Sequence, residues 1–149
     1  MKKKGYTLIE LIVVMAILSI LFGCGFTMIN TLNKIKKEVE LEDAVYRVHS
    51  LLSYAKSSCR KKFIEGIILI DQVDNTISFQ YRINNKDIIE RTETFSNNIK
   101  VRKNVGENKI SVSDKGYLNT AGSIDIESGE RKYKITISVG IDDINIKED

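Results

Sequence analysis

One acidic residue stands near the start of a strongly apolar stretch. Residues 4–14 read KGYTLIELIVV, and Glu10 lies among aliphatic side chains that would partition into lipid. A carboxylate inside a membrane span costs about 2.5–3.5 kcal/mol on insertion scales, so such a residue is by default a functional one with a specific partner. The chemistry that fits it best is an ion pair with a cation.

The remaining chemistry-bearing residues do not form a catalytic set. The chain has two cysteines, Cys24 and Cys59, and one histidine, His49. Catalysis needs a nucleophile or base beside an orienting group, or a metal with an open position, and the sequence has no motif of either kind. Asp142 and Asp143 would point to opposite faces of a strand, which favours a solvated strand end over a calcium site. We therefore expect no enzymatic activity, no metal and no cofactor.

The basic excess of the chain lies at its extreme N-terminus. The 149 residues carry 23 Lys and Arg against 20 Asp and Glu, a formal net charge of +3. Lys2, Lys3 and Lys4 account for that excess, so the chain after Gly5 is formally neutral in its side chains. This balance does not indicate a domain-wide basic footprint for nucleic acid. The length allows one domain plus an anchor.

Residues 8–29 form an apolar segment in which only Glu10, Ser19 and Thr27 carry polar side chains. As a helix it would rise about 33 Å, enough to cross a hydrocarbon core of about 30 Å. The simplest interpretation is a single-pass anchor or an uncleaved signal. A second interpretation is a lipoprotein signal, because residues 21–24, LFGC, approximate the pattern that precedes a lipidated cysteine, with Phe22 a poor fit.

Residues 2–20, KKKGYTLIELIVVMAILSI, resemble the signal and N-terminal helix of type IV prepilins and pseudopilins. The likeness covers a short basic leader, a glycine, an aromatic residue, Thr-Leu-Ile-Glu and an aliphatic helix, in that order. It implies that a prepilin peptidase cuts between Gly5 and Tyr6 on the cytoplasmic side and methylates the new Tyr6 amine. Tyr6 replaces the commoner phenylalanine and keeps the aromatic character.

The same resemblance implies a partner for Glu10. Cleavage before Tyr6 would create an ammonium four residues upstream, and an ion pair would cancel charge that lipid or a filament core disfavours. In the family, this acid neutralises the terminal amine of a neighbouring subunit during assembly. The alternative is a pair at i, i+4 within one chain, worth about 0.2–0.5 kcal/mol on an exposed helix. The sequence leaves both open.

The resemblance also implies a domain plan and a location. Residues 1–5 would be the leader, 6–29 the membrane and assembly helix, and 30–149 the globular domain. The N-terminus would be cytoplasmic and the domain extracytoplasmic, reaching the surface in a filament after assembly. The expected partners are the prepilin peptidase, other pilin or pseudopilin subunits, the inner-membrane assembly platform and membrane lipid.

Beyond the apolar segment the hydrophobic pattern becomes one-sided. Apolar residues recur at spacings of four and three, which predicts one buried helix stripe of Leu41, Val45, Val48, Leu52, Ala55 and Cys59. The opposite face is polar, with Glu40, Asp43, Arg47, Ser50, Ser53, Lys56 and Ser57. No proline interrupts the chain, so we expect one helix from about residue 7 to 60. Cys24 and Cys59 would then lie about 50 Å apart, too far for a disulfide. Gly23 and Gly25 mark its weakest point, suited either to bending or to close helix packing.

From Gly66 onward the apolar period changes to two, which is typical of half-buried strands. We expect strands near 66–71, 76–83, 87–94, 99–103, 109–113, 123–127, 131–138 and 141–146. The predicted fold is α+β and pilin-like: a long N-terminal α-helix whose outer half packs on an antiparallel β-sheet. Residues 51–59 followed by 115–146 resemble the minor pseudopilins of the GspH/FimT type, although Gly140-Ile141-Asp142-Asp143 departs from their usual Gly-Arg-Ile strand.

These features favour a minor subunit of a type IV pilus, a type II secretion pseudopilus or a competence pseudopilus. One alternative is a competence DNA-uptake pseudopilin that contacts DNA through Arg60-Lys61-Lys62 or through Lys100 with Arg102-Lys103. Phosphate binding scales with the number of neutralised charges, and both basic groups are short. The other alternative is a lipoprotein or a single-pass anchored binding module.

Overall fold

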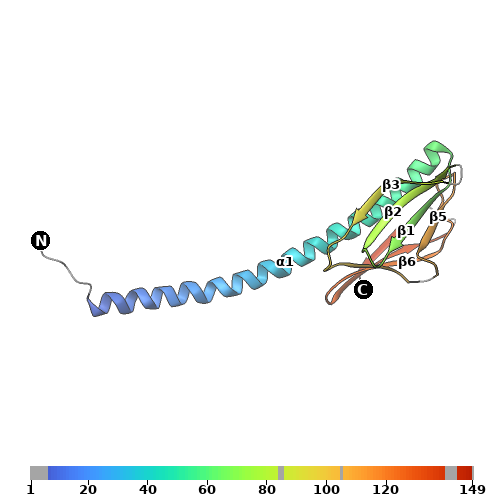
Figure 1. Cartoon of the computed structure of the whole chain (residues 1–149). Helices are drawn as coiled ribbons and strands as arrows, with labels where there is room; N and C mark the ends of the chain where they lie inside the picture. The colour runs from blue at the N-terminus through green and yellow to red at the C-terminus, as the bar shows by residue number, and fades with distance from the viewer. Residues whose placement is uncertain (1–6, 84–85, 105, 140–143, 149) are drawn as a thin grey trace, which may run out of the picture. The chain divides into compact units, whose positions relative to one another are not determined.

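The computed structural model describes residues 7–83, 86–104, 106–139 and 144–148. In these residues one helix, α1, runs from Leu8 to Lys62 and eight strands follow it (Figure 1). The chain divides into two compact units, residues 1–36 and residues 37–149. The division falls within α1, so each unit contains part of that helix.

The first unit contains the apolar part of α1. All described side chains of residues 7–36 are exposed. The helix here is supported by its own backbone hydrogen bonds, and the Ser19 hydroxyl donates to the carbonyl of Met15 at 2.8 Å. Among the described residues, α1 is the one helix that is long and apolar enough to cross a membrane, with a mean hydropathy of 2.5 in its most apolar window.

The second unit contains the rest of α1 and two four-stranded antiparallel sheets. The first sheet has the order β3-β2-β1-β5, from β1 (Gly66–Asp71), β2 (Thr76–Ile83), β3 (Lys86–Thr94) and β5 (Lys109–Val112). The second sheet has the order β4-β6-β7-β8, from β4 (Lys100–Lys103), β6 (Gly122–Ser128), β7 (Arg131–Ile137) and β8 (Ile144–Glu148).

Both sheets and the second part of α1 share one hydrophobic core. All six residues of the predicted helix stripe are buried, and Ala44 and Leu51 widen the stripe. The strands contribute alternate residues, such as Ile68 and Phe79 from the first sheet and Ile124 and Ile135 from the second. In Figure 1 the cyan-to-green part of α1 lies alongside the strands of this unit. This core confirms the predicted α+β fold.

Two details differ from the sequence-based expectation. The expected single sheet is two sheets, and α1 bonds to both, since Arg47 binds Glu93 of β3 and Arg131 of β7 binds Glu38. The last strand begins at Ile144 and ends at Glu148, two residues beyond the expected end, while residues 141–143 lie outside the described residues. Its register places Ile144 opposite Ile137 of β7, which keeps the apolar side chain on the core side.

Candidate assembly site

The N-terminus of α1 is closed by a capping box formed by Thr7 and Glu10. The backbone N–H of Thr7 donates to Glu10 Oε2 at 2.8 Å, and the Thr7 hydroxyl donates to the same oxygen at 3.0 Å. In return the backbone N–H of Glu10 donates to Thr7 Oγ1 at 3.4 Å. This reciprocal arrangement satisfies backbone donors that the first helical turn would otherwise leave unpaired. Glu10 therefore has a structural task in addition to its charge.

The capping box uses only one of the two carboxylate oxygens of Glu10. Both donors from Thr7 go to Oε2, and among the described residues Oε1 has no hydrogen-bond partner. The carboxylate also lies at the positive end of the helix dipole, which favours a negative charge there. The arrangement fixes the direction of the carboxylate and leaves Oε1 open to a further donor.

Thr7 is the functional residue that the sequence interpretation did not single out. The signal for it was present, because Thr-Leu-Ile-Glu at residues 7–10 is the Thr-x-x-Glu pattern of a capping box directly before an apolar run. The other predicted site residues, Lys2, Lys3, Lys4, Gly5 and Tyr6, lie outside the described residues. The predicted pairing of Glu10 with a Tyr6 amine therefore stays a prediction.

The apolar side chains that follow Glu10 are open to contact on all sides of the helix. Leu11, Val14, Ile17 and Leu21 are between 51% and 62% exposed. Exposed apolar surface on this scale marks a membrane or protein contact, because leaving it in water costs roughly 25 cal/mol per Å². This segment is suited to contact with lipid or with an apolar protein surface.

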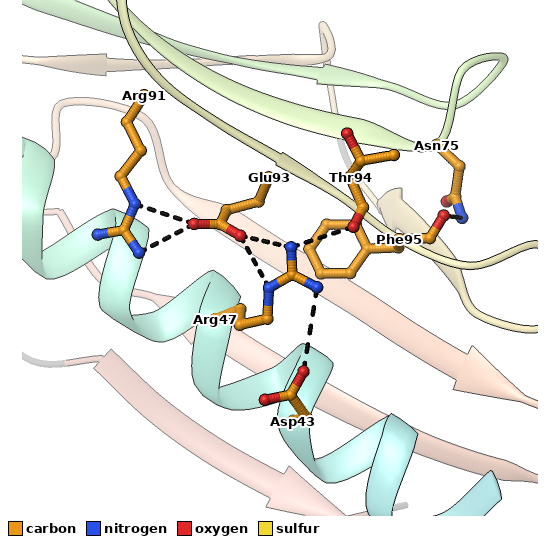
Figure 2. A network of polar contacts seen from close by, with 7 residues as sticks. All are labelled: Asp43, Arg47, Asn75, Arg91, Glu93, Thr94 and Phe95. Carbon is orange, nitrogen blue, oxygen red and sulfur yellow. Dashed lines mark hydrogen bonds and ion pairs between the residues drawn. The ribbon is translucent and has the colours of Figure 1, made fainter.

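The second part of α1 is held on the first sheet by a network of ion pairs (Figure 2). Arg47 lies between Asp43 of its own helix and Glu93 of β3, and its Nε donates to Glu93 Oε2 at 2.8 Å. Its guanidinium also donates to the carbonyl of Thr94 and lies 5.1 Å from the centre of the Phe95 ring. Arg91 binds the other oxygen of Glu93 at 2.9 Å.

This network changes the acidity of Glu93. Partial burial would raise the pKa of its carboxyl, but the hydrogen bonds from Arg47 and Arg91 outweigh burial and hold the pKa below its ordinary value. Arg47 belongs to the predicted polar face of the helix, and its half-buried side chain binds Glu93 of β3. The long arginine side chain reaches back along the helix surface to the sheet edge, which a simple helical-wheel pattern does not reveal.

Cys59 and His49 do not belong to a metal-ligand cluster among the described residues. Cys59 is fully buried in the core, and burial raises the pKa of its thiol to about 11. Cys59 thus occupies the buried position that the helix stripe predicts for it and packs there as a small apolar side chain. His49 is half-buried beside the stripe. Within residues 7–83, 86–104, 106–139 and 144–148, no group of three or more His, Cys, Asp and Glu could hold a metal.

Each of the two short basic groups considered for DNA has cations bound within the chain. Lys62 binds Glu90 at 2.9 Å and lies over the Tyr81 ring, while Arg60 donates to the carbonyl of Lys115. Lys103 points inward, where its Nζ donates to the carbonyl oxygens of Glu107 and Lys109 at 2.7 and 2.8 Å. Burial lowers the pKa of Lys103. At least one cation of each group is thus bound within the chain.

Comparison with known proteins supports the interpretation of both units. The family described as the prokaryotic N-terminal methylation motif matches residues 1–23. A search among curated proteins gives no match to the chain. Among solved structures, the minor pseudopilin EpsH from the Type 2 Secretion System of Vibrio cholerae matches with a TM-score of 0.52. The match covers 74% of this chain and 94% of that chain at 12% sequence identity, which is evidence for the fold.

The motif accounts for the basic leader, the capping box and the apolar helix, while the fold match extends to the strands that follow. The chain thus carries the prokaryotic N-terminal methylation motif at residues 1–23 and has the fold of a minor pseudopilin.

Proposed function

We propose that the chain is cleaved after Gly5, methylated on the Tyr6 amine, and assembled as a subunit of a type IV pilus-like or pseudopilus filament. The observation that carries the proposal is the Glu10 carboxylate, held by Thr7 at the head of an exposed apolar helix segment with Oε1 open. An ammonium is the donor that such an oxygen binds most strongly.

Assembly follows from two physical steps. Before polymerisation, the apolar part of α1 sits in lipid, with the N-terminus on the cytoplasmic side and residues 37–149 on the other side. In the filament, neighbouring helices replace the lipid, and the terminal amine of one subunit binds Glu10 of another. Because both charges are removed from water together, a subunit in the wrong axial position would leave each unpaired at a cost of about 3–5 kcal/mol. Glu10 would thus set the register of the helices.

The proposal implies three kinds of protein partner, besides membrane lipid. A prepilin peptidase removes residues 1–5, an assembly platform in the membrane extracts the processed subunit, and other pilin-like subunits surround the apolar helix. Membrane lipid is the partner before assembly. The fold match to a minor pseudopilin supports a minor subunit.

The processing step is tested by the mass of the mature N-terminus, measured on the full chain from cells that contain a prepilin peptidase. We expect a chain that begins at Tyr6 and carries one added methyl group. A diacylglyceryl group on Cys24 would instead establish the lipoprotein alternative, and an intact Met1 start would establish a simple anchor. Either result would overturn the proposal.

The role of Glu10 is tested by incorporation into sheared filaments. We expect Glu10→Ala and Glu10→Gln to reduce incorporation at least about tenfold while processing continues, since the loss of one buried ion-pair partner exceeds 1.4 kcal/mol. Thr7→Val is the matched control, because it removes the hydroxyl of the capping box and keeps the carboxylate. It should reduce incorporation far less. Equal incorporation of Glu10→Ala and the native chain would contradict the electrostatic role.

A further inference from the structure

The outward face of the second sheet is basic. Alternation along the strands places Ile124, Ile126 and Ile135 in the core and the intervening residues on the opposite face. Among the described residues this outward face carries five cations and two carboxylates: Lys100 and Arg102 of β4, Lys132 and Lys134 of β7, Lys147 of β8, and Asp125 and Glu127 of β6. We call these five cations the basic face. They come from three strands far apart in sequence, so the sequence shows no cluster.

The two carboxylates neutralise only part of the basic face. Lys132 binds Asp125 at 2.8 Å and Arg102 approaches Glu127 at 3.5 Å. In the register Lys134 lies between Asp125 of β6, which binds Lys132, and Lys147 of β8, and among the described residues no salt bridge to Lys134 or Lys147 is formed. Like charges directly opposite one another destabilise a strand pair. An anionic partner that covers this face would relieve the repulsion between Lys134 and Lys147.

The chain carries a matching acidic surface on α1. Residues 38–43 read EVELED, with four acids and no cation. Opposite the buried stripe, Glu42 and Asp43 are exposed between Val39 and Tyr46, which are 57% and 71% exposed. We call Val39, Glu42, Asp43 and Tyr46 the acidic helix face. An exposed tyrosine beside carboxylates is typical of interface residues, because tyrosine supplies a large contact area.

We propose that the acidic helix face of one copy docks on the basic face of the second sheet of a second copy. This inference rests on the proposed function and adds to it that copies of this subunit occupy adjacent positions. The two surfaces differ, so the contact is heterologous and leaves one of each free at the ends of the assembly. Such a contact does not close on itself, so a few adjacent copies can lie within a filament of other subunits.

Charge balance favours a second copy over a nucleic acid. The side chains after Gly5 are formally neutral as a whole, so the excess positive charge of the basic face is matched by excess acid elsewhere on the same chain. The described residues of the basic face include no aromatic side chain on which a base could stack. A duplex would also leave the acidic helix face without a role.

The test is cross-linking between two differently tagged full-length copies in cell membranes. One copy carries Val39→Cys in the acidic helix face, and the other carries Thr136→Cys, which is exposed on the outward face of the second sheet beside Lys134. The matched control replaces Thr136→Cys by Thr92→Cys, since Thr92 is exposed on the outward face of the first sheet, paired with Ser78. Copies without added cysteines give the background. We expect a cross-linked pair with Thr136→Cys and only background with Thr92→Cys.

Charge reversal makes the test specific. Lys134→Glu with Lys147→Glu in the second copy should reduce the cross-link more than about tenfold, because juxtaposed like charges cost several kcal/mol. Glu42→Lys with Asp43→Lys in the first copy alone should do the same. Combining both reversals should restore the cross-link, which separates lost docking from lost folding. Equal yield with Thr92→Cys, or yield that ignores charge reversal, would overturn the proposal.

Docking and the proposed function can fail separately. A methylated subunit that enters filaments without the Val39–Thr136 cross-link would reject the docking and leave the function. A cross-link that responds to charge reversal in a chain that is never processed would support the docking and reject the proposed function. If the detergent-solubilised chain binds duplex DNA through Lys134 and Lys147 without the cross-link, the basic face belongs to nucleic acid and the docking proposal fails.

Discussion

The two parts of α1 have the same backbone conformation and opposite surroundings. In residues 8–36, all described side chains are exposed, whereas Leu41, Val48, Leu51 and Leu52 in the second part are at most 1% exposed. The difference shows that helix formation and burial are separate properties. The first part needs lipid or neighbouring subunits to cover it, while the second part is covered by its own two sheets.

Replacing one leucine by alanine in each part of α1 should give the largest difference in the free energy of unfolding. Leu52→Ala removes a fully buried side chain from the core and should lower the free energy of unfolding by about 2–5 kcal/mol. Leu18→Ala, in the apolar part, should leave that free energy unchanged, because Leu18 is 41% exposed and has no core around it. Urea unfolding of the detergent-solubilised full chain, followed by tyrosine fluorescence, measures both. Equal destabilisation by the two variants would show that the apolar part contributes to the core.

A glycine in each of the two units gives the next comparison. A Cβ on Gly66 of β1 would lie 2.5 Å from Phe79 Cε2 and 2.8 Å from Cys59 Sγ, so Gly66→Ala forces the core apart. We expect a loss of up to about 3 kcal/mol in the same unfolding measurement. A Cβ on Gly23 of α1 meets nothing within 4 Å, and alanine is about 1 kcal/mol better than glycine inside a helix.

Gly23→Ala should therefore raise the helix content seen by circular dichroism in detergent and leave the unfolding of the core unchanged. A fall in filament incorporation with normal helix content would indicate that Gly23 is needed for bending or close packing during assembly. A stability gain with Gly66→Ala would contradict the close approach of β1 to the helix.

Much of this contrast could be predicted from the sequence, because it depends on periodicity. Apolar residues on all sides predicted the uncovered part of α1, and the stripe from Leu41 to Cys59 predicted the covered part. The strand positions followed from the period of two, since side chains alternate between two faces. The split into two sheets could not be predicted, because it depends on which strands pair, such as β1 with β5 across 40 residues of chain.

Some residues of the candidate sites could be predicted from the sequence and others could not. Glu10 could be found because one charge in an apolar run is a local signal, and the capping box with Thr7 could have been found from local spacing. The basic face could not, because Lys100, Lys134 and Lys147 come together only through strand pairing. Lys103, which the DNA alternative groups with Arg102, points inward because successive residues of a strand face opposite sides.

The ion pair between Arg47 and Glu93 holds the second part of α1 on the first sheet by charge. Glu93→Gln removes it and should lower the free energy of unfolding of the second unit by about 1.5 kcal/mol at neutral pH, a typical value for hydrogen bonds to a charged group. The pKa of Glu93 lies below its ordinary 4.5, so its carboxylate stabilises the fold above that pH, and the contribution is lost as the pH falls below it. Unfolding of the native chain and of Glu93→Gln from pH 7 to pH 3 should therefore converge in the acid range.

A matched control for that measurement is Asp43→Asn. Asp43 approaches Arg47 at only 3.9 Å with its side chain 61% exposed, so its removal should change stability by less than about 0.5 kcal/mol. A pH-independent gap between the native chain and Glu93→Gln would mean that Glu93 acts through packing and not through its charge.

The smallest expected effect concerns the C-terminal end of α1. The N–H of Ile64 donates to the carbonyl of Cys59 at 3.3 Å, and Phe63 between them has a φ of 53°, the left-handed conformation that glycine adopts most easily. Phe63 is 81% exposed, so its ring gains little from packing. Phe63→Gly should relieve backbone strain of about 1–2 kcal/mol and lose part of that gain to the greater freedom of glycine in the unfolded chain.

The net result should be a gain below about 1 kcal/mol, measured by urea unfolding of the full chain. Phe63→Ala is the control, because it removes the ring and keeps the unfavourable backbone conformation, so it should give no gain. If both variants lower the stability, the ring itself holds the end of the covered part of α1. The two ends of the helix would then be secured by different means, a polar capping box at Thr7 and an aromatic side chain at Phe63.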